Sequence, residues 1–462
     1  MGAMTSPLAL LEKYCLPGPR YTSYPTAPYF HTGFTSTEWE ETLRGQGQCN
    51  RPLSVYVHLP FCESLCYYCG CNMVVSHDYQ KAEHYLAVLK QEVQLVASRL
   101  GTTQTVKQLH WGGGTPTYLR PEDIRQLADF LASIFHLDKD AEIACEMDPR
   151  RLSQSHIEAL RASGFNRVSL GIQDLQPEVQ AAINRVQPLS VITDVCHWIR
   201  QAGMKSLNFD LMIGLPHQTV QTFTQTLDHC IALQPDRFAV FNYAHVPWMK
   251  KHQKLIREET LPSFTERLAL QQLTLDKLQQ AGYAYIGMDH FAKTSDELWI
   301  AQKNKTLWRN FQGYTTHKDM DILAFGASAI SQTENVYAQN LKNLPEYQQA
   351  IEQGRLPIEK GLLVTKQDQL HRAAITHILC DLEIDKRAFE KKWNIVFDAY
   401  FHAALIDFKE MEKDGLLLLG TDTTQVTEIG RLFLRNIAMC LDFYLKNSVD
   451  SVSSPPRYSK TV

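Results

Sequence analysis

The chain has 462 residues, which is too long for one ordinary single-core domain but fits an α/β barrel with a smaller second domain. Apolar residues make up 44% of it and charged residues 21%, so a mainly disordered or collagen-like chain is excluded. The net charge of −4 provides no general positive field, and nucleic acid and anionic lipid are not expected as partners. No apolar run has the length of a membrane span, and we expect a soluble, cytoplasmic protein.

Short apolar runs alternate with segments of helical period from about residue 53 onward, which predicts repeated β/α units around a parallel sheet. Six strands are predicted, at residues 53–59, 106–111, 141–147, 166–172, 205–212 and 236–243. Helices are predicted between them, the first two at residues 79–100 and 121–135. A further strand at 283–288 follows a helix over 264–281, and residues 289–316 read as an irregular loop.

The pattern changes after about residue 366, where helices predominate. They are predicted at residues 367–382, 386–393, 397–413 and 428–445, with a short hairpin between the last two. This change of pattern indicates a separate, mainly helical domain at the C-terminal end.

Four of the eleven cysteines fall within ten residues, in the segment CESLCYYCGC that begins at Cys62. The odd number of cysteines and the absence of a secretion signal favour metal ligation over disulfides. Cys62, Cys66 and Cys69 have the spacing C-x3-C-x2-C and follow the first predicted strand. Three thiolates hold three irons of a four-iron, four-sulfur cluster and leave one open, which the amino-acid part of S-adenosylmethionine (SAM) can chelate. The spacing therefore predicts a radical SAM enzyme.

Zinc is the weaker alternative, because zinc sites usually gather paired ligands from two segments and no second pair is visible. Two roles remain open for Cys71, the fourth cysteine of the segment. It is either a spare ligand or substrate-side residue, or only a small buried side chain.

Polar or glycine-rich residues end several of the predicted strands, where barrels of this kind place their chemistry. Residues 112–117 (GGGTPT) would let a ligand approach the backbone closely. Glu146 ends the third strand, and a carboxylate there can accept hydrogen bonds from ribose hydroxyls. The other polar strand-end residues are Asp148, Gln173, Asp174, Arg185, Asp210 and those at 242–245. Each alone is typical of a solvated loop, but on consecutive strands they predict a cosubstrate site.

Tyr56 and His58 alternate along the first predicted strand, so their side chains share one face. They lie a few residues before the cysteine loop. Both readings stay open for them: they line the interior near the cluster, or they fill the barrel as ordinary packing residues.

Longer segments match one family along nearly the whole chain. They are PRYTSYPTA, HLPFCESLCYYCGCN, LHWGGGTPTYL, EMDPR, GIQD, FNYAH, GMDHFA and RNFQGYTT. With these segments the sequence resembles the bacterial oxygen-independent coproporphyrinogen III oxidase (dehydrogenase) family of haem biosynthesis. The resemblance implies an incomplete (β/α)6-type radical SAM barrel at residues 36–365, an N-terminal segment at 1–35 packing near the active site, and a mainly helical domain at 366–462.

The resemblance also implies the cofactors and their ligands. Cys62, Cys66 and Cys69 would bind the cluster, and Tyr56 and Cys71 would lie at the catalytic centre. The cluster-bound SAM would contact Tyr56, Gly113, Glu146 and Ile330. A second SAM would contact Tyr68, Gly114, Thr115, Gln173, Arg185, Asp210 and Ala244.

The reaction that the resemblance implies is oxidative decarboxylation of two propionates of coproporphyrinogen III to vinyls, giving protoporphyrinogen IX. A 5′-deoxyadenosyl radical would start it, and a low-potential donor such as a flavodoxin or ferredoxin would supply the electron to a monomeric enzyme. Arg20, Lys293 and Arg309 are the cationic candidates for the four substrate carboxylates. The rival functions are a haem-binding chaperone and a haem-degrading radical SAM methyltransferase. Cys71 and the PRYTSYP segment favour the oxidase over the chaperone.

Overall fold

A computed structural model describes residues 7–49, 51–447 and 458–461. Its main sheet contains β1 (Leu53–Leu59), β4 (Thr105–Gly113), β5 (His136–Met147), β6 (Arg167–Gln173), β7 (Ser206–Ile213), β8 (Arg237–Asn242), β9 (Tyr283–Gly287), β10 (His290–Lys293), β13 (Asp321–Phe325), β14 (Ile330–Gln332), β15 (Val336–Asn340) and β16 (Ile358–Leu363). These strands pair in the order β16-β15-β14-β13-β1-β4-β5-β6-β7-β8-β10-β9. Since β16 and β9 end the order, the sheet is an open, incomplete barrel, as expected.

The six predicted strands are confirmed as β1 and β4 to β8, which run parallel to one another. The third strand begins at His136, five residues earlier than predicted, because its first residues pair with the start of β4. A seventh parallel strand, β13, pairs with β1 and was not predicted. All five of its residues are buried, and a run this short carries no periodicity that separates a strand from a loop.

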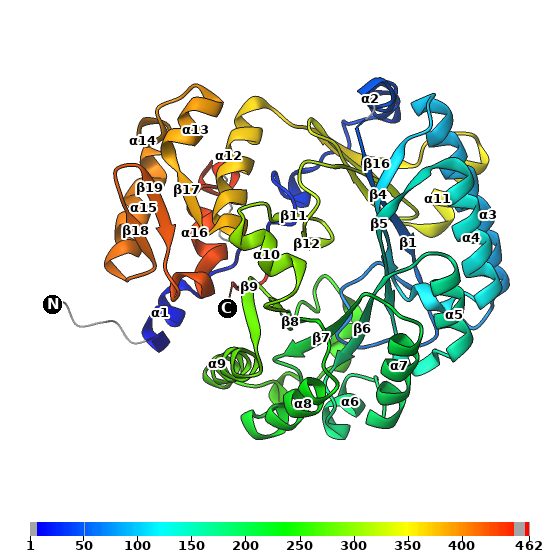
Figure 1. Cartoon of the computed structure of the whole chain (residues 1–462), viewed down its shortest axis with the longest axis horizontal. Coiled ribbons are helices and arrows are strands. Elements are labelled where there is room, and N and C mark those ends of the chain that lie inside the picture. Colours follow the sequence, from blue (N-terminus) through cyan, green and yellow to red (C-terminus); the bar gives the residue numbers. More distant parts are fainter. Residues whose placement is uncertain (1–6, 50, 448–457, 462) are drawn as a thin grey trace.

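Helices cover the outer face of the curved sheet (Figure 1). They are α2 (Ser36–Cys49), α3 (Gln80–Leu100), α4 (Pro121–Ile134), α5 (Gln154–Ala162), α6 (Pro177–Ala182), α7 (Leu189–Gln201), α8 (Val220–Ala232), α9 (Phe264–Gln280) and α11 (Leu344–Glu352). None of the helices in the described ranges combines the length and apolarity that crossing a bilayer requires.

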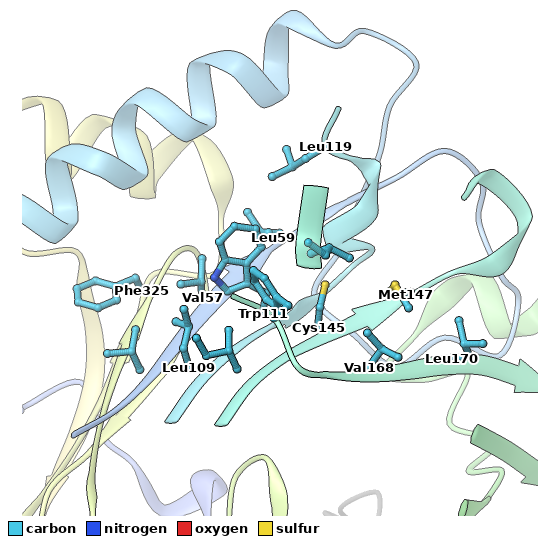
Figure 2. Packing of buried hydrophobic residues seen from close by; sticks show 14 of the residues in the cluster. Val57, Leu59, Leu109, Trp111, Leu119, Cys145, Met147, Val168, Leu170 and Phe325 are labelled. Carbon is cyan, nitrogen blue, oxygen red and sulfur yellow. The ribbon is translucent and has the colours of Figure 1, made fainter. Parts of the chain in front are cut away.

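Apolar side chains fill the space between the sheet and these helices. Figure 2 shows Val57, Trp111, Cys145 and Val168 on this face, and Trp111 is fully buried against Phe165 with ring centroids 4.8 Å apart. Successive residues of a strand point to opposite faces. The residues that alternate with these apolar ones therefore point into the barrel, and several of them are polar.

The irregular stretch predicted at 289–316 contains regular structure. It includes β10, α10 (Glu297–Lys303) and a hairpin of β11 (Trp308–Asn310) with β12 (Gly313–Thr315). These elements are short, and β10 runs antiparallel to β8 and β9. The prediction of a loop was therefore wrong for this stretch, because elements of three to seven residues show no clear pattern.

The C-terminal part is mainly helical, as predicted. It contains α12 (Lys366–Thr376), α13 (Lys386–Trp393), α14 (Phe397–Tyr400), α15 (His402–Lys413), α16 (Leu434–Cys440), α17 (Phe443–Asn447) and a small sheet of β17 (Glu383–Asp385), β18 (Leu417–Leu419) and β19 (Thr423–Val426). The helix predicted at 397–413 is broken at Phe401, whose backbone leaves the helical region. The helix predicted at 428–445 is replaced by a 3-10 turn (Gly430–Phe433), α16 and α17.

The N-terminal segment packs against this C-terminal part. Its helix α1 (Pro7–Tyr14) lies beside the C-terminal helices, close to the last described residues (Figure 1). The amide of Thr461 donates to the carbonyl of Leu16 at 2.8 Å. The buried guanidinium of Arg435 donates to the carbonyls of Gly18, Pro19 and Lys460. Residues 16–19 and 460–461 are thus held together beside α16.

One buried carboxylate connects α3 to the strands that the sequence did not predict. Glu92 is 2% exposed and accepts hydrogen bonds from the amide of Gly326 (2.7 Å), the hydroxyl of Tyr347 (2.6 Å) and the side-chain amide of Asn340 (2.6 Å). Burial raises the pKa of Glu92 to about 7, although these three donors oppose the shift. The bonds hold the end of β13, which pairs with β1, and the end of β15, which lies two strands further out, against α3.

We expect Glu92→Leu to lower the free energy of unfolding by about 3 kcal/mol, because it leaves three buried donors without an acceptor. Glu83→Leu, at an exposed position of the same helix, should change it by less than about 0.5 kcal/mol. Denaturant titration followed by circular dichroism measures both, and equal losses would contradict the role of Glu92. Because its folded pKa is raised, the wild type should also lose stability relative to Glu92→Gln as the pH increases from 5 to 8.

Candidate active site

The curved sheet encloses a cavity of about 420 Å³. At the carboxyl ends of the strands it is lined by the cysteine loop, Glu146, Gln173 and Asp210. At the amino ends it is lined by Glu142, Arg167 and Arg237. Arg167 forms an ion pair with Glu142, and both arginines form ion pairs with Glu297. The site therefore lies inside the barrel, with its polar residues concentrated around the cysteine loop.

The cysteine loop lies between two very short paired strands, β2 (Phe61–Cys62) and β3 (Val74–Val75). Cys62, Cys66 and Cys69 all line the cavity. Their sulfur atoms have polar neighbours: the hydroxyl of Thr115 lies 3.3 Å from Cys62, Arg150 and Arg185 donate to Cys66 at 3.4 and 3.5 Å, and the amide of Cys71 donates to Cys69 at 3.4 Å. Such hydrogen bonds to sulfur tune iron–sulfur clusters in proteins.

The surroundings of the thiols suit metal ligation. The hydrogen bond from Cys71 lowers the pKa of Cys69 to about 6, which favours the thiolate form that metal ligation requires. Cys71 itself is exposed and lines the cavity, so the reading of it as a small buried side chain was wrong.

Glu146 lies at the boundary of the main cavity and a smaller one of about 240 Å³. It accepts hydrogen bonds from His110 and from the amide of Gly113, each at 3.2 Å. Burial alone would raise the pKa of Glu146, but the bond from His110, the charge of that ring and the Gly113 amide together lower it. The carboxylate is therefore ionised at neutral pH and can accept further hydrogen bonds.

Tyr56 and Ile330 line the smaller cavity with Glu146, so three of the four residues expected around the first SAM meet there. The ring of Tyr56 stacks on His110 with centroids 5.9 Å apart, and its hydroxyl lies 3.2 Å from Nδ1 of His58. His58 also lines this cavity, which favours the functional over the packing reading of its position.

Gly113, the fourth residue, lines the main cavity beside the cysteine loop. Its φ of +116° is strained for any other residue, and a Cβ atom there would lie 2.7 Å from the His58 ring. Glycine at this position therefore leaves the backbone open to the cavity.

A second group of residues lines the main cavity on the other side of the cysteine loop. Arg185 donates to Asp148 at 2.9 Å and to the carbonyl of Gly171 at 2.6 Å. Burial would raise the pKa of Asp148, but the charges of Arg185 and Arg150 lower it to about 2. The residues expected around a second SAM that line this cavity are Tyr68, Gly114, Thr115, Gln173, Arg185 and Asp210.

Asp210 differs from the other carboxylates of the site. It accepts hydrogen bonds from Ser169 and Asn208, both at 2.8 Å, yet burial raises its pKa to about 7. Ala244, the last of the residues expected around a second SAM, follows β8 by two residues and is not among those that line the cavity.

Three cationic residues were predicted to meet the substrate carboxylates. Arg20 and Arg309 lie near the mouth of the barrel at the carboxyl ends of the strands, and Lys293 does not. Arg20 lies 3.7 Å from Asp289 and donates to the carbonyl of Asn242 at the end of β8. Arg309 lies over the ring of Tyr314, which lines the cavity. Lys293 instead pairs with Asp236 at the start of β8, because β10 runs antiparallel to β8. It is not among the residues that line the cavity.

Sequence analysis did not identify several other residues of the site. His110 is hydrogen-bonded to Glu146, and Arg150 donates to Asp148. Because His110 alternates with the buried Leu109 and Trp111, the sequence could have shown that its side chain faces inward. The loop after β8 was also missed. Its Lys250, His252 and Gln253 are hydrogen-bonded to the carbonyls of Cys71, Cys69 and Tyr68, and no local pattern predicts contacts with a segment 180 residues earlier.

Comparison with known proteins agrees with this site. Residues 56–230, which carry the cysteine loop and most of the strand ends, match the family model of the Radical SAM superfamily. The oxygen-independent coproporphyrinogen III oxidase of Synechocystis is 43% identical over 442 residues, 95% of each chain. That of Escherichia coli is 44% identical over 439 residues, again 95% of each chain.

This chain belongs to the oxygen-independent coproporphyrinogen III oxidase family.

A solved structure supports the same conclusion for the fold. The coproporphyrinogen III oxidase of Escherichia coli, described as a radical SAM enzyme, superposes with a TM-score of 0.90 at 43% identity. The match covers 95% of this chain and 98% of that one. The family and its superfamily imply a four-iron, four-sulfur cluster and SAM as the cofactors, and the three clustered thiols with their hydrogen-bond donors fit them.

For this member of the family we expect Cys62→Ser, Cys66→Ser and Cys69→Ser each to abolish the visible absorbance of a cluster reconstituted without oxygen. Each removes one of three thiolates, and an alcohol is a poor substitute for one. Cys71→Ser, the matched control in the same loop, should keep the absorbance and the bound iron. A full cluster in all three variants would overturn the ligand assignment.

Proposed function

We propose that this chain catalyses the oxygen-independent oxidative decarboxylation of two propionates of coproporphyrinogen III to vinyls, giving protoporphyrinogen IX. The observation that carries the proposal is the match to enzymes of this name over 95% of the chain at 43–44% identity. Both terminal regions are included in that match, which a shared radical SAM barrel alone would not require. The same observation favours the oxidase over the haem-binding chaperone and the haem-degrading methyltransferase.

Cys62, Cys66 and Cys69 are the proposed cluster ligands, with Tyr56, Gly113, Glu146 and Ile330 around the SAM bound there. When bound, cluster and SAM supply a carbon radical, the chemistry needed to take a hydrogen from a propionate. The ionised Glu146, oriented by His110, can accept hydrogen bonds from ribose hydroxyls. Burial keeps the Tyr56 phenol protonated by raising its pKa, so its hydroxyl stays a donor. We place Tyr56 and Cys71 at the catalytic centre because they line the two cavities that meet at Glu146.

A second SAM is proposed beside the first, contacted by Tyr68, Gly114, Thr115, Gln173, Arg185, Asp210 and Ala244. Six of these seven residues line one cavity, which supports a common ligand. Among the described residues, Nε of Arg185 is buried without a hydrogen-bond partner and can serve a ligand carboxylate. Asp210 offers a carboxylate for ribose hydroxyls.

The substrate carboxylates are proposed to meet Arg309 and Arg20. Within the described ranges, Nε and Nη1 of Arg309 are buried and have no hydrogen-bond partner, which is costly unless a ligand satisfies them. Arg309 donates to the backbone carbonyl of Arg20, so the Arg309 guanidinium lies beside the segment that carries Arg20. Guanidinium groups suit the bidentate binding of propionates.

One anaerobic assay tests the reaction. Reconstituted protein with a low-potential reductant, SAM and coproporphyrinogen III should give a product lighter by two carbon dioxide and two hydrogen molecules, detected by mass spectrometry. The Cys62→Ser variant should give none under the same conditions. Stable haem binding without loss of carbon dioxide would contradict the oxidase and support the chaperone.

A pH titration tests the second SAM. In the ligand-free protein Asp210 has a pKa of about 7, so it is mostly neutral at pH 6 and charged at pH 8. Ribose hydroxyls donate to the charged form, and the affinity for the second SAM should rise up to about tenfold between these values. Asp210→Asn should bind the second molecule weakly and without this pH dependence, while the first stays bound. Equilibrium dialysis with labelled SAM measures both, and two tightly bound molecules in Asp210→Asn would contradict the assignment.

A further inference from the structure

The loop of residues 246–257, between β8 and α9, lies directly on the back of the cysteine loop. His252 Nε2 lies 2.7 Å from the carbonyl oxygen of Cys69, and Lys250 donates to the carbonyl of Cys71 at 3.0 Å. Gln253 donates to the carbonyl of Tyr68 at 3.0 Å. These bonds use the backbone of the cysteine loop and leave the thiols facing the cavity. The 246–257 loop thus packs against the side of the cysteine loop that carries these carbonyls.

The outer surface of this loop is apolar at its centre. Trp248 is 51% exposed, Met249 62% and Leu255 56%. Single exposed apolar residues are normal on a protein surface, but three large ones within eight residues form a patch. Tryptophan and methionine are enriched where proteins bind one another. The catalytic cavity does not explain why these three side chains point outward.

The same loop is strongly basic, in a chain whose net charge is −4. Residues 246–257 carry Lys250, Lys251, Lys254 and Arg257 and no Asp or Glu, and the acidic pair Glu258 and Glu259 follows them. Lys251, Lys254 and Arg257 are exposed, and within the described part of the chain none of the three forms an ion pair. Unpaired positive charge around an apolar centre is the complement of an acidic protein surface.

We propose that the 246–257 loop is the docking surface for an acidic, low-potential protein that donates one electron at a time. The inference rests on the proposed function, because a cluster that cleaves SAM must be reduced in every cycle. One electron leaves the donor and one enters the cluster, and no bond forms or breaks between the two proteins. Electron transfer weakens steeply with distance, and this surface is one hydrogen bond from the backbone of the cluster ligand Cys69.

Charge and apolar contact have separate roles in this docking. The exposed Lys251, Lys254 and Arg257 attract the donor over a distance and increase the rate of association. Trp248 and Met249 then pack against it, which stabilises the complex once water is excluded. The interaction should therefore weaken as salt concentration rises, since exposed charges are screened.

The test uses the full-length, cluster-reconstituted protein and a flavodoxin, an acidic protein that carries a flavin, as the probe. Lys251→Glu/Lys254→Glu should slow cluster reduction by reduced flavodoxin at least about tenfold and remove most of its dependence on salt. Trp248→Ala should weaken binding of oxidised flavodoxin, measured by calorimetry, with little effect on the salt dependence. The matched control is Lys391→Glu/Lys409→Glu, the same charge change at exposed positions of α13 and α15. It should behave as the wild type.

A small chemical reductant separates docking from a role of the loop as a lid over the cavity. With it, cluster reduction and SAM cleavage should be the same in all variants if the loop only docks the donor. Loss of SAM cleavage under these conditions in the Lys251→Glu/Lys254→Glu variant would overturn the proposal, as would unchanged reduction by flavodoxin. Because cluster reduction and flavodoxin binding are measured directly, the docking proposal is tested even if coproporphyrinogen III is not the substrate.

Discussion

The barrel interior depends on one chain of polar contacts that crosses the amino ends of the strands. It runs from Ser54 through Gln108 and Glu142 to Arg167, and then through Glu297 to Arg237. Six elements, β1, β4, β5, β6, β8 and α10, each contribute one member. Inward-facing polar residues can be buried only if they are paired, and here each charge has an opposite partner. Because the partners come from different strands, the network fixes the curvature of the sheet and closes the lower end of the cavity.

At the carboxyl ends of the same strands, the buried carboxylates have different partners. Glu142 and Glu146 are four residues apart on β5, and in both cases neighbouring cations and hydrogen-bond donors outweigh burial and lower the pKa. Glu142 is bound by Gln108 and Arg167, whereas Glu146 accepts hydrogen bonds from His110 and the amide of Gly113 and borders two cavities. The charged groups of this network at the amino ends are therefore ion-paired within the fold, whereas Glu146 at the carboxyl ends keeps capacity for a ligand. The cysteine loop lies on the same side of the cavity as Glu146.

Much of this arrangement could be predicted from the sequence. The six parallel strands and the cysteine loop depend on local patterns, apolar alternation and residue spacing, and both were correct. What could not be predicted depends on contacts between distant segments. β13 is recognised only by its pairing with β1, and Lys293 was misplaced because the sequence does not show that β10 reverses direction. The contacts of the 246–257 loop with the cysteine loop are likewise tertiary.

The two terminal regions serve the site through packing. Tyr21 and Tyr24 share one apolar cluster with Phe408 and Ile437 of the C-terminal part and with Ile286 of β9. The bonds of Arg435 to backbone carbonyls hold the segment that carries Arg20, and although burial lowers the pKa of Arg435 to about 10, it stays charged at neutral pH. Arg20 then reaches the mouth of the barrel.

The hydroxyl of Tyr314, in the hairpin that carries Arg309, donates to the carbonyl of Leu379 just after α12. The hairpin is thereby anchored to the C-terminal part as well. The cations proposed for the substrate come from outside the parallel strands and are positioned by the C-terminal part. The residues proposed for the cofactors therefore come from the barrel, whereas the cations proposed for the substrate carboxylates also depend on the two terminal regions.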